Sequence, residues 1–584
     1  MSSHKHIEYE RASFVYPGHS PSGESGFDLQ IMDGETVLLL GPSGSGKSTL
    51  ALCLSGLIPH AIAGELSGHI RINGVDTQLT EPGQLAETVG TVFQDPEAQA
   101  IMMTVEDEVA FGLENLGVAP EEMEERITEA LRQTGLSTKR LMEIDNLSGG
   151  QKQRLALASV LAMKPSILVL DEPTSNLDPV GTDDIFQILR ELKATRRHTI
   201  LIIEHKLDEL VDIVDRVVVI DDHGQLVCSA APELVFYDWA EELNRLGIWM
   251  PKAVELAKCW QGSLSLLNSR PLTTEQLEKA VLATIKRGLA KPNDFTGHPL
   301  FFNGNNTAEG QPAAISQNNR EQQLLLEIRP IQSPSLRATC LKPLELQVHK
   351  GEFWAIVGEN GAGKTTLARH LMGLSPVRAG TVFLDGRDCT SYSARELASK
   401  IGYVFQNPEH QFVTERVQDE VAFGLLELGM TSLGIAVVVE QLLSRFGLSK
   451  YADIHPFRLS HGQKRRLSVA VMLAASQELL ILDEPTFGQD RRYAAELMEM
   501  LKELQRSGRT ILMITHDMSL VAEYAEFAAV LSQGSIHYSG PVMELFSNKD
   551  TLAPFGLKLP PAVVLEQRLA KQIGGPPICN KEPI

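Results

Sequence analysis

The sequence predicts an α/β fold present in two tandem copies, each with a mainly parallel sheet covered by helices. Short landmarks recur in the same order in the two halves of the chain. Within each half, apolar runs of about five residues alternate with longer amphipathic stretches, which is typical of strands and helices in a parallel sheet. The 584 residues also exceed the size of one average domain.

The internal repeat has five landmarks, each recurring at an offset of roughly 312 residues. Repeats in a conserved order with small insertions indicate a duplicated domain. The paired landmarks are Gly41–Thr49 with Gly358–Thr366, Gln94–Glu97 with Gln406–Glu409, Leu147–Gln151 with Leu459–Gln463, Asp171–Thr174 with Asp483–Thr486, and His205 with His516.

We predict four segments from this repeat. The two repeated domains occupy residues 1–240 and 323–555. Residues 241–322 are expected to form a helical appendage followed by a flexible linker, because the part from Phe295 to Gln323 is rich in Asn, Gln, Gly and Pro. Residues 556–584 form a C-terminal tail with scattered prolines and no clear pattern.

Composition excludes several classes of protein. The 74 acidic and 53 basic residues give a formal charge of −21, which argues against binding nucleic acid through its backbone. Six cysteines without a CxxC pair predict no disulfide scaffold or metal cluster and fit a reducing cytosol. We find no run of 18 apolar residues and no apolar N-terminal segment, so we expect neither a membrane span nor a signal peptide. A membrane role would then require a partner.

The first landmark matches GxxxxGK[ST] between an apolar strand, Thr36–Leu40, and a helix starting near Ser48. This pattern predicts a phosphate-binding loop whose backbone N–H groups surround the β-phosphate of a nucleotide. A chance glycine-rich turn is the alternative, and two matches in the same context argue against it. The predicted loop residues are Gly41, Pro42, Ser43, Gly44, Ser45, Gly46, Lys47, Ser48 and Thr49, and Gly358, Glu359, Asn360, Gly361, Ala362, Gly363, Lys364, Thr365 and Thr366.

Side chains of this loop have distinct expected roles. Lys47 and Lys364 would neutralise the β- and γ-phosphates. The hydroxyls of Ser48 and Thr365 would be ligands of Mg²⁺, which prefers hard oxygen donors.

Two apolar strands, Ile167–Leu170 and Leu479–Leu482, end in paired carboxylates. Asp171 and Asp483 are predicted to hold Mg²⁺ through water, and Glu172 and Glu484 to act as general bases toward the attacking water. A single apolar run followed by Asp-Glu would ordinarily be a solvated strand end. Its place after the other landmarks, in both halves, favours function.

The landmark Leu147-Ser-Gly-Gly-Gln151 precedes a helical stretch, so alone it could be a helix N-cap at Ser148. With the phosphate loop, Gln94, Asp171-Glu172 and His205 around it, it resembles the signature motif of ATP-binding-cassette ATPases. Both repeats carry this resemblance, which implies two P-loop ATP-binding-cassette domains, each with a helical subdomain beside its sheet, and an activity that hydrolyses ATP with Mg²⁺.

The resemblance also implies two composite sites, because such domains close head to tail. One site would join Lys47, Gln94, Glu172 and His205 to the signature residues Ser460, His461, Gly462 and Gln463. The other would join Lys364, Gln406, Glu484 and His516 to Ser148, Gly149, Gly150 and Gln151. The His residues would contact the γ-phosphate, and Gln94 and Gln406 would sense Mg²⁺ and water. Tyr16 would stack on adenine.

The second half departs from the family pattern in three places. His461 replaces a signature glycine, and the segment Pro330–Ser335 offers no aromatic to match Tyr16. The segment after the carboxylates also differs, Ser175–Asp178 against Phe487–Asp490. Both Glu and both His are present, so we predict that both sites hydrolyse ATP, at unequal rates.

Two further segments, Val105–Gly112 and Val417–Gly424, indicate which group of ATP-binding-cassette ATPases the chain resembles. Their Val and Phe residues fit the core face of an amphipathic helix. Together with Gln94–Gln99 and Gln406–Gln411, the sequences of these segments also resemble those of the ATPases of energy-coupling-factor importers of vitamins and metal ions. The fused arrangement is similar to the hydroxymethylpyrimidine/thiamine type.

This resemblance implies a transmembrane scaffold subunit and a substrate-binding membrane subunit as partners, at the cytoplasmic face of the cell membrane. The main alternative is a soluble tandem ATPase acting on ribosomes or nucleic acid, against which the acidic charge and the Asn- and Gln-rich linker argue. A regulatory ATPase with no transport partner is a third reading. Sequence leaves the transported solute open.

Overall fold

The computed structural model describes residues 5–17, 26–175, 177–260, 269–290, 323–329, 341–342, 344–427, 429–475, 477–486, 488–547 and 552–573. The chain divides into two compact units. The first comprises Met1–Leu289 with Asp490–Arg492, and the second comprises Ala290–Gln489 with Tyr493–Ile584. The linker predicted at Phe295–Gln323 lies almost entirely outside the described residues.

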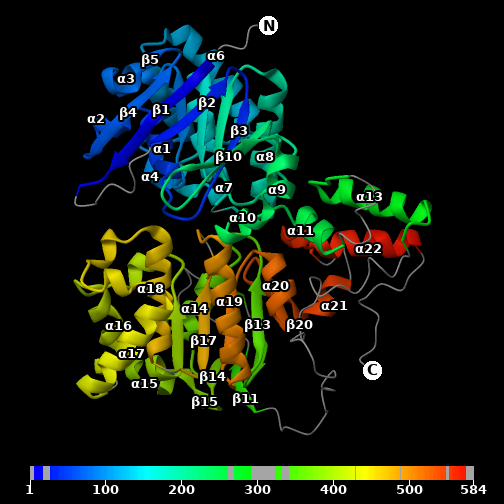
Figure 1. Cartoon of the computed structure of the whole chain (residues 1–584). Coiled ribbons are helices and arrows are strands. Elements are labelled where there is room, and N and C mark those ends of the chain that lie inside the picture. The colour runs from blue at the N-terminus through cyan, green and yellow to red at the C-terminus, as the bar shows by residue number, and fades with distance from the viewer. Residues whose placement is uncertain are drawn as a thin grey trace. The chain divides into compact units, whose positions relative to one another are not determined.

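The first unit is built on a six-stranded sheet in the order β10-β9-β3-β8-β7-β6. Two of its strands, β3 and β10, are labelled in Figure 1. All neighbouring strands pair in parallel except β10, an antiparallel edge strand. The strands are β3 (Thr36–Leu40), β6 (Val89–Val92), β7 (Ile167–Asp171), β8 (Thr199–Ile203), β9 (Arg216–Ile220) and β10 (Leu226–Ala230).

A second, antiparallel sheet of the first unit has the order β2-β1-β4-β5. Its strands are β1 (Lys5–Val15), β2 (Phe27–Met32), β4 (Glu65–Ile72) and β5 (Val75–Asp76). The helices of this half are α1 (Lys47–Leu54), α2 (Leu57–His60), α3 (Pro82–Leu85), α4 (Pro96–Gln99), α5 (Val105–Asn115), α6 (Pro120–Gln133), α7 (Gly149–Ala162), α8 (Pro179–Thr195), α9 (Pro232–Asp238), α10 (Ala240–Arg245), α11 (Lys252–Cys259) and α13 (Thr274–Lys286).

The central strands are buried on both faces, which explains their continuous apolar sequences. Successive side chains of a strand point to opposite faces. Leu38 and Leu40 of β3 therefore join a core with α7 and α8, while Val37 and Leu39 join a core with α1 and the antiparallel sheet. The sheet is thus the middle layer of the unit.

Helices α5 and α6 form a subdomain with a core of its own. This core contains Val109 and Leu113 from α5, Ile127 and Leu131 from α6, and Leu155 from α7. Helix α6 begins with Pro120, has two glutamates in its first turn and has Arg132 in its last turn, so these charges interact favourably with the helix dipole. Since α7 contributes to this core and to the sheet core, it connects the subdomain to the sheet.

The second unit repeats this architecture, with sheet orders β16-β17-β18-β13-β19-β20 and β12-β11-β14-β15. The central strands are β13 (Phe353–Val357), β16 (Ile401–Val404), β17 (Leu479–Asp483), β18 (Thr510–Ile514), β19 (Phe527–Ser532) and β20 (Ser535–Pro541), and the antiparallel strands are β11 (Leu324–Ile328), β12 (Leu346–His349), β14 (Val382–Leu384) and β15 (Arg387–Asp388). The helices are α14 (Lys364–Leu371), α15 (Ala394–Lys400), α16 (Val417–Glu427), α17 (Ser432–Arg445), α18 (His461–Ala474), α19 (Arg491–Arg506), α20 (Met518–Tyr524), α21 (Val542–Ser547) and α22 (Pro561–Ile573).

The predicted fold class is confirmed in both units: a mainly parallel sheet with flanking helices and a helical subdomain. Helices α10, α11 and α13 lie in the segment where we expected a helical appendage, and they belong to the first unit. The predicted tail contains α22, which its sequence did not suggest. Among the described residues, no helix is both long and apolar enough to cross a membrane.

The double burial of β3 generates a stability prediction. Leu38 is fully buried at the centre of the sheet, whereas Leu79 is 87% exposed. We expect Leu38→Ala to lower the free energy of unfolding by about 2–5 kcal/mol, because it removes buried methyl groups and leaves a cavity. The matched control Leu79→Ala should change it by less than about 0.5 kcal/mol. Urea denaturation measures both, and equal losses would contradict this description of the core.

Candidate active sites

The first phosphate loop joins the end of β3 to the start of α1. Gly44 and Gly46 have positive φ angles of 83° and 96°, which only glycine adopts readily. The Lys47 ammonium donates to the carbonyls of Gly41 and Pro42, each at 2.8 Å. The loop therefore curves around its own lysine, and Lys47, Ser48 and Thr49 form the first turn of α1.

The second loop, Gly358–Gly363, repeats this geometry between β13 and α14. Gly361 and Gly363 have φ angles of 81° and 104°. Lys364 donates to the carbonyls of Gly358 at 2.7 Å and Glu359 at 2.9 Å. A Cβ on Gly358 would lie 2.0 Å from the Leu531 carbonyl oxygen, so a side chain there cannot fit. Thr365 and Thr366 follow in α14.

Both loop lysines are buried. Burial lowers the pKa of Lys47, and the nearby carboxylates of Glu172 and Asp171 oppose that effect. Each loop thus presents backbone N–H groups at a helix N-terminus with a lysine among them. This arrangement suits polyanionic phosphate.

The predicted metal ligands lie together in each unit. Thr365 Oγ1 donates to Asp483 Oδ2 at 2.8 Å, and Ser48 forms the corresponding hydrogen bond with Asp171. Burial raises the pKa of Asp171 to about 6. Its Oδ1 atom is buried and has no hydrogen-bond partner among the described residues. A hydroxyl beside a buried, under-satisfied carboxylate is a donor set that fits Mg²⁺.

The predicted general bases follow these aspartates, and each has an unusual backbone. Glu172 and Glu484 have positive φ angles of 47° and 50°, a conformation that is costly for a residue with a Cβ. Non-glycine residues held in this way cluster at functional sites.

Side chains from other landmarks reach both glutamates. Gln94 Nε2 donates to Glu172 Oε2 at 2.8 Å, and His205 Nε2 lies 3.2 Å from Glu172 Oε1. In the second unit, His516 Nδ1 lies 2.8 Å from Glu484 Oε1. The structure therefore brings the predicted Gln, Glu and His together in the first unit, and Glu and His in the second.

The two signature segments begin long helices. Ser148 and Ser460 form capping boxes with Gln151 and Gln463, in which each serine accepts from the glutamine N–H and each glutamine side chain accepts from the serine N–H. The glycines Gly149, Gly150 and Gly462 lie in the first turns of α7 and α18. The side chain of His461 lies outside the described residues.

Tyr16 lies next to the first phosphate loop. Its hydroxyl is 3.1 Å from Thr49 Oγ1, and its ring packs edge-on against Phe14. The ring is partly exposed, so a face is accessible to a stacking group. The second-unit segment Pro330–Ser335, where we found no matching aromatic, lies outside the described residues.

Sequence reasoning missed several residues that contact the site groups. Thr515 Oγ1 donates to Glu484, and Tyr403 donates to Asp483 Oδ2 at 3.1 Å. Arg465 donates to backbone carbonyls, including that of Gln406. Comparing the two repeats position by position would have singled out Tyr403 and Arg465, since their counterparts are Thr91 and Gln153.

Two buried glutamates hold the segments that follow Gln94 and Gln406. Glu108 accepts from the backbone N–H groups of Ile101 and Met102, and Glu420 accepts from those of Val413 and Thr414. From the sequence we interpreted this motif as the apolar face of a helix and as part of a family resemblance, and gave its acidic residue no role. Its acidic residue also joins the helix to the preceding segment.

Comparison with known proteins shows the family of this chain. A family model described as ABC transporter matches residues 25–175 and 341–487. A protein of Methanosarcina acetivorans, provisionally named an ABC transporter ATP-binding protein, is 40% identical over 97% of this chain and 90% of its own length. The chain belongs to the ABC transporter ATP-binding family. It is an ATP hydrolase with two ATP-binding-cassette domains.

Other relatives differ in how fully they match this ABC ATPase. A Bacillus subtilis protein, provisionally named the HMP/thiamine import ATP-binding protein YkoD, is 39% identical over 94% of this chain and 93% of its own length. The structure of cbiO1 from Clostridium perfringens, described as part of the ABC transporter complex cbiONQ, matches 44% of this chain and 100% of its own at 30% identity and a TM-score of 0.37.

The raised pKa of Asp171 predicts how stability depends on pH. The folded pKa, about 6, lies above the ordinary value of 3.8, so the buried carboxyl is best tolerated when protonated. Its contribution to stability is fully present below about pH 4 and is lost as pH rises through about 6. We therefore expect Asp171→Asn, which mimics the protonated form, to raise the free energy of unfolding at pH 8 by on the order of 2 kcal/mol.

Urea denaturation without nucleotide at several pH values measures this effect. The gain of Asp171→Asn over the unchanged chain should shrink as the pH falls toward 4. The exposed control Asp222→Asn should show little gain at any pH. A gain for Asp171→Asn that is constant with pH would contradict the assignment.

Proposed function

We propose that this ABC ATPase is the energy-coupling subunit of an importer of the energy-coupling-factor type. The observation that carries the proposal is the duplication of one set of groups, with a phosphate loop, a buried Asp followed by a Glu, and a His in each unit. Likeness to the provisionally named HMP/thiamine import protein over nearly the whole chain supports import as the process.

The proposed chemistry assigns each residue a task. Backbone N–H groups of the loops, with Lys47 and Lys364, bind the β- and γ-phosphates. Mg²⁺, where bound, would offset phosphate charge and be held by Ser48 and Asp171, or by Thr365 and Asp483, with Gln94 and Gln406 close by.

Glu172 and Glu484 accept a proton from the attacking water, and each is oriented by its neighbouring histidine. His205 and His516 then contact the γ-phosphate. In the first unit, Gln94 is hydrogen-bonded to Glu172, so it is placed to interact with the attacking water that Glu172 would deprotonate.

We further propose that each signature helix completes the ATP site of the other domain, as the family resemblance implies. The capping boxes support this role, because they fix the first turns of α7 and α18 with their N–H groups directed outward from the helix start. Helix N-termini of this kind favour anionic phosphate. Closure on ATP and opening after hydrolysis would supply the movement that drives transport.

The segments held by Glu108 and Glu420 are the proposed docking surface for a transmembrane scaffold subunit. Ile101 and Met103 are 65% and 75% exposed, and Val413 is also exposed. Apolar side chains held outward on a fixed segment are costly in water and suit contact with another protein. The partners would place the chain at the cytoplasmic face of a membrane, with a separate membrane subunit binding a vitamin, its precursor such as hydroxymethylpyrimidine or thiamine, or a metal ion.

The two proposed general bases can be tested separately. We expect Glu172→Gln and Glu484→Gln each to lower kcat for ATP, by about 100-fold at a site that depends on its base, because the amide cannot accept the proton of water. Phosphate release by the purified chain measures the rate, and exposed Glu233→Gln serves as the matched control. A variant that keeps the full rate would show that its site is idle.

The import role predicts a specific set of partners. A pull-down of the tagged chain from its native membranes in mild detergent should recover a transmembrane scaffold and a substrate-binding membrane subunit, whose ligand names the cargo. Met103→Asp should reduce that recovery, whereas Leu79→Asp, which places the same charge at an exposed apolar residue outside the proposed surface, should not. Recovery with ribosomes and no membrane protein would contradict the importer and favour the alternative tandem ATPase.

A further inference from the structure

Arg465 is a fully buried arginine in the second unit, on helix α18, five residues after the signature serine Ser460. A guanidinium removed from water needs acceptors for its five N–H groups. Its position directly behind the hydrolytic site raises the question of what it binds.

The guanidinium is surrounded by backbone carbonyls from two segments of the site. From the segment after β16, it donates to Phe405 and to Gln406, the latter at 3.1 Å. From the end of β17, it donates to Asp483 at 2.6 Å, to Glu484, and to Pro485 at 3.2 Å. One rigid planar group therefore joins the peptide of Gln406 to the peptides of the metal-binding aspartate and the general base.

Arg465 keeps its charge in this position. Burial lowers its pKa to about 10, and the carboxylates of Asp483 and Glu484 work against that decrease. The group is therefore a cation at neutral pH, and charge-assisted hydrogen bonds to carbonyls are stronger than neutral ones. Loss of the guanidinium would leave several buried carbonyls without this donor.

The first unit has a different residue at the same position. Gln153 corresponds to Arg465 in the repeat, and it is also buried. Its Nε2 atom has no hydrogen-bond partner among the described residues. The first unit therefore tolerates a neutral amide where the second has a guanidinium with five hydrogen bonds.

A second position shows the same difference. The Tyr403 hydroxyl donates to the side chain of Asp483, whereas the corresponding Thr91 has a buried hydroxyl with no partner among the described residues. In the second unit, Asp483 at the end of β17 is thus bound twice. Tyr403 donates to its side chain, and Arg465 donates to its backbone carbonyl. In the first unit, the described link between the segment of Gln94 and the base is the side-chain bond from Gln94 to Glu172.

We propose that Arg465 is a positioning residue for ATP hydrolysis in the second unit, where it fixes the peptide groups of Gln406 and Glu484 relative to each other. The left-handed backbone of Glu484 is a strained conformation that such bonds help to maintain. This difference in backbone support is a physical source of unequal rates at the two sites. The inference depends on the proposed role of Glu484 as general base.

The test replaces Arg465 with the residue that the first unit uses. The variants are compared in a full chain that also carries Glu172→Gln, so that turnover reports the second site. There, Arg465→Gln should lower kcat for ATP by about tenfold, because small displacements of a reacting group cost this much or more. KM for MgATP should change less than twofold, since the phosphate loop is not involved. Arg465→Lys keeps the charge and up to three donors, so its kcat should lie between those of Arg465→Gln and the unchanged chain.

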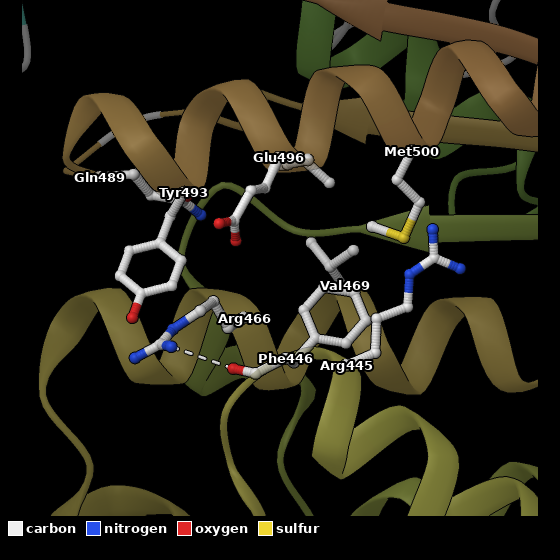
Figure 2. A pocket seen from close by; sticks show the side chains of 9 residues that line it. Arg445, Phe446, Arg466, Val469, Gln489, Tyr493, Glu496 and Met500 are labelled. Atoms are coloured by element: carbon white, nitrogen blue, oxygen red, sulfur yellow. Dashed lines mark hydrogen bonds between the residues drawn. The ribbon is translucent and has the colours of Figure 1, made fainter. Parts of the chain in front are cut away.

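Arg466 on the same helix provides the matched control. It donates to the Phe446 carbonyl at 3.0 Å and lies 4.0 Å from the Tyr493 ring centre. These groups line a small cavity of about 50 Å³ between the α17 end, α18 and α19 (Figure 2), and its lining does not include Asp483 or Glu484. Arg466→Gln removes a neighbouring arginine of α18 whose hydrogen bond goes to Phe446 and not to Gln406 or Glu484. It should keep kcat.

Hydrogen–deuterium exchange measures how well the Arg465 hydrogen bonds hold the backbone near Gln406 and Glu484. Arg465→Gln should speed exchange in peptides covering residues 401–411 and 479–486, and Arg466→Gln should not. An unchanged kcat in Arg465→Gln overturns the proposal, as does a loss of kcat equal to that of Arg466→Gln. If Arg465→Gln lowers Tm by more than about 5 °C, Arg465→Lys decides, and a full kcat in that variant overturns the proposal.

Glu484→Gln measured beside these variants separates the two claims. If Glu484→Gln is slow and Arg465→Gln is not, the positioning role alone fails. If Glu484→Gln keeps the full rate, the general base and the positioning role both fail. A loss in both, with KM preserved in Arg465→Gln, supports both.

Discussion

Four parallel strands in each central sheet end at one edge, and every reacting group of the unit depends on this alignment. In the first unit, β3 leads into the phosphate loop, β8 into His205, β7 into Asp171 and Glu172, and β6 into Gln94. The second unit uses β13, β18, β17 and β16 in the same way. Because parallel strands share a direction, four sequence segments that lie far apart meet without long side chains or special loops.

Repetition and strand-end chemistry made much of this predictable from the sequence. The buried strands, both phosphate loops and the carboxylates lie where the patterns indicated, because a glycine-rich turn after an apolar strand has few structural alternatives. Helix α7 begins at Gly149 inside the signature itself, since Ser148 is its N-cap. The groups that support the site escaped prediction. Thr515, Tyr403 and Arg465 act through hydrogen bonds between residues distant in sequence, which neither periodicity nor spacing encodes.

The two units of this ABC ATPase share their proposed reacting groups but differ in the residues that hold those groups in place. Both units keep Asp, Glu and His, and both glutamates have the same left-handed backbone. The residues behind them differ, with Thr91 and Gln153 in one unit and Tyr403 and Arg465 in the other. On the proposed roles of Glu484 as base and Arg465 as positioning residue, the two sites differ in rate although they contain the same proposed catalytic side chains.

The carboxylates of Glu108 and Glu420 restrain the backbone of the segments after Gln94 and Gln406. Each glutamate stands in the first turn of its helix and accepts hydrogen bonds from two backbone N–H groups of the preceding segment. Because of these hydrogen bonds, we expect a displacement of Ile101 or Val413 to move α5 or α16 together with its preceding segment. Helix α5 shares a core with α7, and α16 shares a core with α18, so on the proposed docking role a displacement at either exposed segment would be passed to the signature helix.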